Sequence, residues 1–389
     1  MKTFLKLIFF SITMSLVCIV VSSCSLIAPN YNDVSNSSID EPAKSEFESG
    51  EGTKNDPYVI AEDYQWLNIN NHLNAYYQLK NNIYLEDLGA IKPIGSSDKP
   101  FEGVIDGKNF TVSNAVISND DECGLFGCIS GGEVKNLNFE DSALSLNVTG
   151  DGAYIGSFAA NLKKGSLIEN CHTNNISMTE TAHGNILGYP KFYAAGFIGI
   201  VQSASKVIYC SCNVSSNAKG NRTIYIAGFV GKMNGGEIDA CYCSGSFDAN
   251  PSSTGGGTPS NRIGGFVYTF SAGTITNVYT ETVFNYVGYA GMFTYENMDD
   301  LDYILSFVEF GHTSKDLGEQ MYYKADIINN AITLSCCKYY GPVTIALSNS
   351  ILDTEVWARN NLWVKGKVHP ELVAYEEYKK IQGNSTSNN

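Results

Sequence analysis

Six short segments of this chain share a pattern that strongly limits its fold, a phenylalanine beside glycine. They read GLFG, IGSF, AGFIG, AGFVG, GGFVY and AGMF, and their phenylalanines are Phe126, Phe158, Phe197, Phe229, Phe266 and Phe293. Successive phenylalanines are 27 to 39 residues apart. A repeat in this range, with strand-like residues and no helical periodicity between the anchors, is typical of a solenoid of short strands with loops of varying length.

A second strand follows each of the first five anchors after a further 11 to 13 residues. Its first position is occupied in turn by Leu137, Cys171, Cys210, Cys241 and Val278. Two residues later, on the same face because strand side chains alternate, come Phe139, Thr173, Cys212, Cys243 and Thr280. Both positions form columns with one residue per coil. Such columns predict a parallel β-helix, in which successive strands stack about 4.8 Å apart.

Turn residues and a helical stretch predict the ends of the coils. Asparagines that suit bends between strands stand just before the columns, at Asn136, Asn170 and Asn277. Before the repeats, a turn at 55–57, a helix over 63–73 and a strand over 77–85 are expected. We expect this region to cap the open end of the sheets, since exposed sheet edges invite pairing with other chains.

The anchors GLFG, GFIG and GFVG, each followed by an Asn-Cys or Asn-Val type strand, resemble the GLUG repeat of bacterial exported and surface proteins. The preceding GTKNDPYVI, YYQLKNNIYL and FEGVIDGKNFTVSNAVIS look like the opening coil of such arrays, and VWARNNLWVKGKVHPEL is similar to their end. The resemblance covers about residues 52–372. It implies a right-handed β-solenoid, and with the helical stretch before the repeats the expected fold is all-β, a right-handed parallel β-helix with an N-terminal cap that contains a short helix. Solenoids of this family are often found in adhesins or as accessory parts of secreted peptidases. Beyond Phe293 the pattern is less regular.

The first 24 residues predict export and lipidation. Lys2 and Lys6 precede an apolar run, and the small residues Ser22 and Ser23 precede Cys24. The run is short for a membrane span, which needs about 20 residues. Val21 to Cys24 also resembles a bacterial lipobox, whose cysteine carries the lipid. An ordinary signal peptide and a retained anchor are the alternatives.

These patterns divide the chain into six parts. They are a signal peptide (1–23), a lipidated flexible tether rich in Ser, Asn and acidic residues (24–51), an N-terminal cap with the first coils (52–123), the repeat coils (124–293), less regular C-terminal coils with a cap (294–372) and a polar tail (373–389). The formal net charge of −15 and the lack of a Lys/Arg patch argue against nucleic acid as a partner.

The paired cysteines leave three interpretations open. Cys210 with Cys212, and Cys241 with Cys243, are CxC pairs within strands, whereas zinc sites usually use CxxC turns. The same columns hold Leu, Phe, Val and Thr in other coils, which favours packing of small buried side chains. A disulfide between stacked coils and a metal site are the alternatives. We predict no metal and no cofactor.

Motifs of catalysis are absent from the sequence. It contains no GxSxG, HExxH, P-loop or GxGxxG segment, and its five histidines share no local motif. A carbohydrate-active β-helix enzyme would need clustered carboxylates, and the candidates do not recur in one column. They are Asp106, Asp120, Asp121, Glu122, Asp141 and Asp239.

A binding surface is the remaining candidate. The residue between the two inward positions points outward, and its column reads Asn138, His172, Ser211, Tyr242 and Tyr279. Exposed tyrosines suit sugar rings or protein partners, and we expect Tyr242 and Tyr279 to contact the ligand. The structural alternative is that they pack under loops.

The sequence therefore predicts a non-catalytic, monomeric lipoprotein at the surface of a bacterial cell. It would be anchored through the lipid on Cys24 and would bind an extracellular glycan or protein. A polysaccharide lyase or hydrolase, or a purely structural envelope protein, is the alternative.

Overall fold

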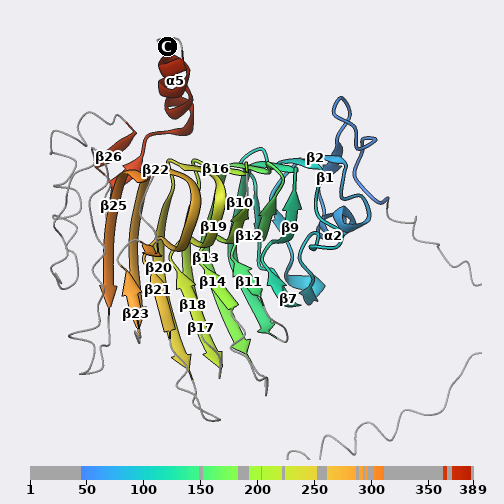
Figure 1. Ribbon diagram of the computed structural model, residues 1–389. Helices are drawn as coiled ribbons and strands as arrows, with labels where there is room; N and C mark the ends of the chain where they lie inside the picture. The colour runs from blue at the N-terminus through green and yellow to red at the C-terminus, as the bar shows by residue number, and fades with distance from the viewer. Residues whose placement is uncertain are drawn as a thin grey trace, which may run out of the picture. The chain divides into compact units, whose positions relative to one another are not determined.

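The computed structural model describes residues 45–148, 152–182, 192–202, 204–220, 224–251, 261–285, 289–291, 294–296, 301–310, 362–365 and 370–386. The contacts divide the chain into two units, Met1–Ser45 and Glu46–Asn389. The second unit is an all-β, solenoid-like fold with parallel sheets, in which strands of successive coils lie side by side (Figure 1).

The first turns of the fold form a cap. Its elements are β1 (Tyr58–Ile60), α2 (Asp63–Asn68), η1 (Ile69–Asn71), β2 (Tyr76–Leu79), β3 (Ile83–Tyr84), η2 (Glu86–Leu88) and β4 (Ala90–Ile91). Helix α2 begins with a capping box, in which the Gln65 side chain accepts from the backbone N–H of Glu62 at 3.1 Å. The predicted helix over 63–73 is thus a short helix followed by a 3-10 turn. Ordered packing begins before the predicted boundary at 51, because Phe47 is buried and stacks on Tyr58 with ring centroids 4.1 Å apart.

Each later coil places strands on three walls. The first wall is β8 (Glu122–Cys123), β11 (Ala153–Gly156), β14 (Phe192–Ala195), β18 (Ile224–Ala227), β21 (Asn261–Gly264) and β23 (Tyr289–Gly291). The second is β9 (Phe126–Ser130), β12 (Ala159–Lys163), β15 (Ile198–Gln202), the start of β19 (Val230–Asp239), the start of β22 (Val267–Asn285) and β24 (Thr294–Glu296).

The third wall carries the longest strands. It contains β5 (Val104–Asp106), β6 (Thr111–Ser113), β7 (Val116–Asp120), β10 (Glu133–Val148), β13 (Leu167–Ala182), β16 (Lys206–Ile208), β17 (Ser211–Gly220), β20 (Tyr242–Pro251), the rest of β19 and β22, and β25 (Leu301–Phe310). Successive coils pair in parallel along it.

The anchor phenylalanines stack through the core. Together with Phe101 of the preceding coil, they form the series Phe101, Phe126, Phe158, Phe197, Phe229 and Phe266, in which adjacent ring centroids are 4.8 to 5.6 Å apart. Each pair contributes about 0.5–1.5 kcal/mol beyond the area it buries. The repeat prediction is confirmed for the anchors from Phe126 to Phe266, whereas Phe293 lies outside the described residues.

The glycines directly before Phe197 and Phe229 are required by the close approach of the next coil. A Cβ atom added to Gly228 would lie 2.1 Å from the carbonyl oxygen of Gly265, and one added to Gly196 would lie 2.0 Å from that of Gly228. Real Cβ atoms do not come this close to backbone, so larger residues are excluded at these positions.

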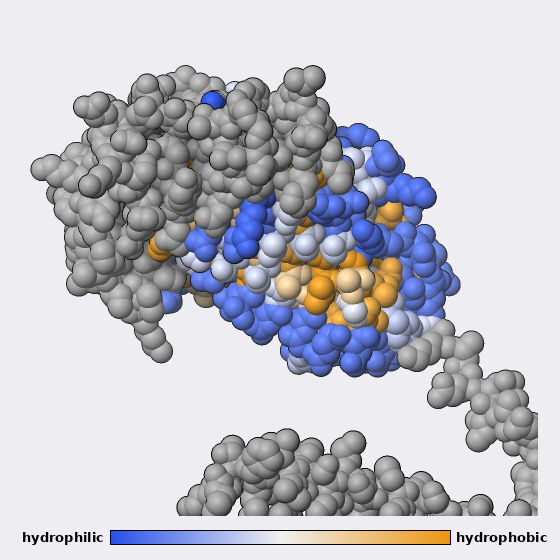
Figure 2. Space-filling model, turned by 90° about the horizontal axis from the view of Figure 1, so that it is seen from below, coloured by the Kyte–Doolittle hydropathy of each residue, from blue (hydrophilic) through white to orange (hydrophobic). Residues whose placement is uncertain are grey.

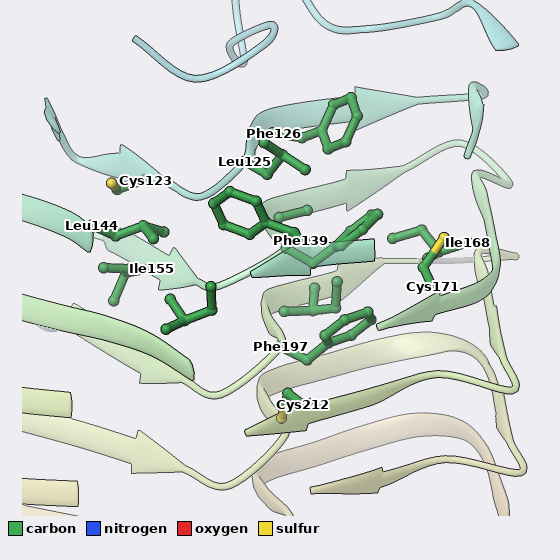
Figure 3. Packing of buried hydrophobic residues seen from close by; sticks show 14 of the residues in the cluster. Cys123, Leu125, Phe126, Phe139, Leu144, Ile155, Ile168, Cys171, Phe197 and Cys212 are labelled. Carbon is green, nitrogen blue, oxygen red and sulfur yellow. The ribbon is translucent and has the colours of Figure 1, made fainter. Parts of the chain in front are cut away.

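The predicted inward columns and bends are confirmed. Phe139, Thr173, Cys212, Cys243 and Thr280 are register partners from coil to coil, and all are buried. Figure 3 shows Phe139, Cys171 and Cys212 among the packed core residues. At the predicted bends, Asn136, Asn170 and Asn277 have positive φ angles of 52° to 53°, as a bend in the left-handed region requires.

The end of the chain differs from the prediction. In place of a polar tail after residue 372, the chain forms helix α5 (Tyr375–Thr386), which follows the antiparallel pair β26 (Trp363–Lys365) and β27 (Pro370–Leu372). Figure 1 shows α5 above the upper ends of the strands. Seen from below, the described surface is largely hydrophilic at its rim and has an apolar area in its middle (Figure 2).

Candidate functional site

The predicted outward column is present in the register of the strands. Asn138 pairs with His172, His172 with Ser211, Ser211 with Tyr242 and Tyr242 with Tyr279. The side chain of Tyr279 lies outside the part that the structure describes.

Tyr242 is not freely exposed, contrary to the expectation from the sequence. It is half-buried against a small apolar cluster of Tyr209, Ala240, Leu362, Val373 and Tyr378, separate from the main core. Three members of that cluster belong to residues 362–365 and 370–386, hereafter the C-terminal segment. The segment therefore covers part of the column that we expected to meet a ligand.

Hydrogen bonds between described residues hold the C-terminal segment on the coils. The hydroxyl of Tyr375 donates to Oε1 of Glu169 at 2.5 Å, and the hydroxyl of Tyr378 donates to Oδ2 of Asp239 at 2.8 Å. In the opposite sense, the hydroxyl of Tyr209 donates to the carbonyl oxygen of Val373 at 2.5 Å. Burial raises the pKa of both donors from the segment, so their hydroxyls stay protonated.

His172 of the same column is a neutral structural residue. Burial lowers its pKa to about 4. One ring nitrogen, Nε2, lies 3.2 Å from Oδ1 of Asn170, and Nδ1 lies 2.8 Å from Oγ of Ser211. Because a carbonyl oxygen only accepts, Nε2 carries the proton and Nδ1 accepts from Ser211. This arrangement fixes the ring instead of presenting a base to solvent.

Four of the candidate carboxylates, Asp106, Glu122, Asp141 and Asp239, accept hydrogen bonds from neighbouring residues of the fold. Asp106 accepts from Asn136 at 3.0 Å and forms an ion pair with Lys108. Burial acts to raise its pKa, but the hydrogen bonds from Asn136 and Lys108 outweigh burial and lower it. Asp141, itself at a bend with φ 49°, accepts from Asn175 at 2.6 Å.

Glu122 belongs to a polar network that ties the loop before the coils to the second wall. Its carboxylate accepts from the backbone N–H of Ser97 at 2.8 Å, from the Ser97 hydroxyl at 2.5 Å and from Nδ2 of Asn161 at 3.2 Å. Lys163 donates to the same hydroxyl at 2.8 Å. These contacts explain Glu122 as a residue that fixes the loop.

The cysteines in the described residues are free thiols and all are buried. Burial raises the pKa of Cys123 to about 12 and that of Cys128 to about 11, so neither is a reactive thiolate near neutral pH. The described part of the chain contains no group of three or more His, Cys, Asp or Glu residues that could hold a metal ion. These thiols thus fit the packing interpretation. Cys24, Cys336 and Cys337 lie outside the described residues.

A row of stacked tyrosines on the first wall was not predicted. Tyr154 pairs in register with Tyr193, and Tyr193 with Tyr225, with ring centroids 5.3 and 5.0 Å apart. The sequence spacing indicates this row, because each tyrosine lies four residues before an anchor phenylalanine. Tyr193 and Tyr225 are only 7% and 4% exposed, so their ring faces serve packing.

The long strands carry a second outward surface, whose side chains are exposed or half-buried. Two register columns reach solvent beyond the bend at Asp141, and alternate residues such as Leu144 and Met178 point into the core. We call these columns the polar face; they are Val116, Ala143, Ser177, Ser215 and Ser246, and Ser118, Ser145, Thr179, Asn217 and Asp248. Most of these side chains are short and bear hydroxyl or amide groups.

Comparison with known proteins gives partial matches. No family model matches the chain. A protein of Evansella cellulosilytica named "Putative Gly-rich membrane protein" is 33% identical over 134 residues, which are 32% of this chain and only 15% of that protein. A solved structure described as "a putative immunoglobulin A1 protease from Bacteroides ovatus" aligns with a TM-score of 0.45 and 18% identity, over 84% of this chain and 95% of the other.

Among the described residues, no helix has both the length and the apolar character needed to cross a membrane. The predicted leader and the lipobox at residues 1–24 lie outside the described part of the chain.

Proposed function

We propose that this chain is a non-catalytic lipoprotein of the bacterial cell surface. Its solenoid binds an extracellular ligand, and the ligand class we favour is a glycan. In this proposal Cys24 carries the lipid, and the solenoid is a right-handed parallel β-helix of the GLUG-repeat kind that acts as a monomer. The name of the Evansella relative, a membrane protein, is compatible with a membrane location.

The polar face is the observation that carries the proposal. Ser145, Ser177, Thr179 and Ser215 are exposed and belong to parallel strands in register. Their hydroxyl groups both donate and accept hydrogen bonds, which is what the hydroxyls of a sugar require. Short side chains also lose little rotamer entropy when they are ordered by a ligand. A rigid row of such groups suits an extended, hydroxyl-rich polymer.

The contacts of the candidate carboxylates support a non-catalytic role. Glycoside hydrolysis needs two carboxyl groups across one bond, about 5–10 Å apart and open to the substrate. Asp106, Glu122, Asp141 and Asp239 instead accept hydrogen bonds from neighbouring coils or from the C-terminal segment. Each carboxylate has a structural explanation that does not need a substrate.

The test is binding of the purified chain, residues 25–389, to arrays of glycans and of host proteins. Thr179→Lys with Ser215→Lys places two long charged side chains on adjacent coils of the polar face and should weaken binding at least tenfold. Asn234→Lys with Ser271→Lys is the matched control, because both residues are exposed on other strands. Equal weakening by both pairs would exclude the polar face as the binding site.

Activity and anchoring are tested separately. Release of oligosaccharides from an acidic polysaccharide, abolished by Glu122→Gln or Asp106→Asn, would contradict the non-catalytic assignment. Cells that express the chain should incorporate radioactive palmitate into it, and Cys24→Ala should remove the label. An unlabelled wild-type chain would refute lipidation at Cys24.

A further inference from the structure

The C-terminal segment packs on the coils but shares neither their core nor their sheets. Its apolar residues join Tyr209 and Ala240 in a cluster distinct from the main core. Strands β26 and β27 pair with each other in a two-stranded antiparallel sheet that is separate from the solenoid sheets. Removing the segment from the coils would therefore break none of the sheet ladders in the described part of the chain.

The coils change their bend residue at the place where the segment packs. The left-handed bend position of successive coils holds Asn109, Asn136, Asn170, Tyr209, Ala240 and Asn277, with φ angles between 52° and 63°. Asparagine tolerates this conformation, whereas tyrosine and alanine adopt it at a cost of roughly 1 kcal/mol or more. Tyr209 and Ala240 are the two apolar members of the series, and both are buried under the segment.

Hydrogen bonds pair two carboxylates of this surface with two tyrosine hydroxyls of the C-terminal segment. Glu169 and Asp239 are each register partners of Ile208, so one apolar residue lies between two carboxylates. Tyr375 and Tyr378, about one helical turn apart on α5, donate one hydroxyl to each carboxylate. The ring of Tyr209 contacts both tyrosine rings, with its centroid 5.0 Å from that of Tyr375 and 5.2 Å from that of Tyr378.

We propose that the surface around Tyr209, Ala240 and Ile208 is a peptide-docking site, and that the chain's own C-terminal segment occupies it as a separable cover. The ligand that fits the site is a short helix with two tyrosines one turn apart, whose hydroxyls meet two carboxylates across an apolar residue. This inference is independent of which ligand the polar face binds. Release of the segment uncovers Tyr242 and the neighbouring part of its column.

Hydrogen exchange on the full chain tests whether the cover is separable. Tyr375→Phe with Tyr378→Phe removes both hydroxyl donors but keeps the rings. Amides of β26, β27 and α5 should exchange at least tenfold faster in this variant, while those of β13, β17 and β20 keep their wild-type rates. Glu377→Gln, an exposed change on the same helix, is the control and should alter neither set. The proposal fails if the coil amides accelerate together with the segment, or if the segment amides do not change.

A synthetic peptide of residues 362–386 tests the docking site itself. Labelled with a fluorophore, it should bind the Tyr375→Phe, Tyr378→Phe chain and raise its fluorescence anisotropy, while the wild-type chain, whose site is occupied, should show at least tenfold weaker binding. A peptide with both tyrosines changed to phenylalanine should bind at least tenfold more weakly than the native peptide. If the native peptide does not bind a variant chain whose segment amides exchange rapidly, the docking site is refuted.

Discussion

The hydroxyl of Tyr378 donates a 2.8 Å hydrogen bond to Oδ2 of Asp239, although 139 residues separate them. The other oxygen of the same carboxylate, Oδ1, accepts from Oγ1 of Thr276 at 2.7 Å and from Nδ2 of Asn277 at 2.6 Å. One buried aspartate therefore joins the C-terminal segment to a bend of the next coil. Substitution of Asp239 and substitution of Tyr378 should therefore have different effects on stability.

Asp239→Asn should lower the free energy of unfolding of the coils by about 1–3 kcal/mol, because an amide cannot accept from all three donors. Tyr378→Phe removes only the contact of the segment and should change the unfolding of the coils by less than about 0.5 kcal/mol. Urea unfolding, followed by hydrogen exchange of the β17 and β20 amides, measures both. A loss of similar size in the two variants would show that the segment is part of the cooperative core.

The inward cysteines should be replaceable by the residues of the next coil. Cys243 lies against Thr280, with its Sγ 3.1 Å from Oγ1, and Thr280 donates to the carbonyl oxygen of Gly265 at 3.0 Å. A threonine at 243 could make the equivalent bond to Gly228. Cys241→Val with Cys243→Thr should thus cost at most about 1–2 kcal/mol in urea unfolding.

The stacked phenylalanines provide the comparison for this prediction. Phe229 has rings on both sides, with centroids 4.9 Å from Phe197 and 4.8 Å from Phe266. Phe229→Ala leaves a cavity within this stack and should cost about 3–5 kcal/mol. If the cysteine variant lost as much stability as Phe229→Ala, packing would not explain the cysteines.

Glu180 should make the fold less stable as the pH rises. It is fully buried, its carboxylate lies 3.0 and 3.2 Å from the hydroxyl of Ser216, and burial raises its pKa to about 7. Because the pKa is higher in the folded state, the contribution of Glu180 to stability is fully present below pH 4.5 and is lost as the pH rises to about 7. The loss is up to roughly 3 kcal/mol. Glu180→Gln should therefore be more stable than wild type at pH 8, with a smaller difference at pH 4.5. An equal difference at both pH values would contradict the assignment.

His172 should have the opposite pH dependence. Its pKa falls from 6.5 to about 4 on folding, so the unfolded chain takes up a proton first and stability decreases as the pH falls between these values. The effect is at most about 3 kcal/mol. His172→Gln keeps an amide that can bond Asn170 and Ser211, and it should lose less stability than wild type between pH 6.5 and 4.5. Because the slopes of His172 and Glu180 oppose each other in this range, each must be measured against its own single variant. A wild-type acid response in His172→Gln would refute the prediction.

Much of the coil could be predicted from short-range patterns. The spacing of Phe158, Phe197 and Phe229 and the strands after them indicated both the solenoid and its register, because a side chain in a strand alternates between two faces and glycine alone allows the neighbouring coil to approach. The asparagine bends followed from the tolerance of asparagine for positive φ. The tyrosine row at Tyr154, Tyr193 and Tyr225 was equally visible in the spacing.

The environment of the outward residues could not be predicted in this way. Periodicity assigns Tyr242 to the outer face, but it does not say whether water or another segment meets that face. Helix α5 reads as a polar tail because few of its residues are apolar, and the partners of Tyr375 and Tyr378, Glu169 and Asp239, are 206 and 139 residues away. The sequence by itself thus determined the repeating coil, since that rests on local spacing. Only the tertiary structure decided which outer surface is covered and which is open, since that depends on a contact between distant segments.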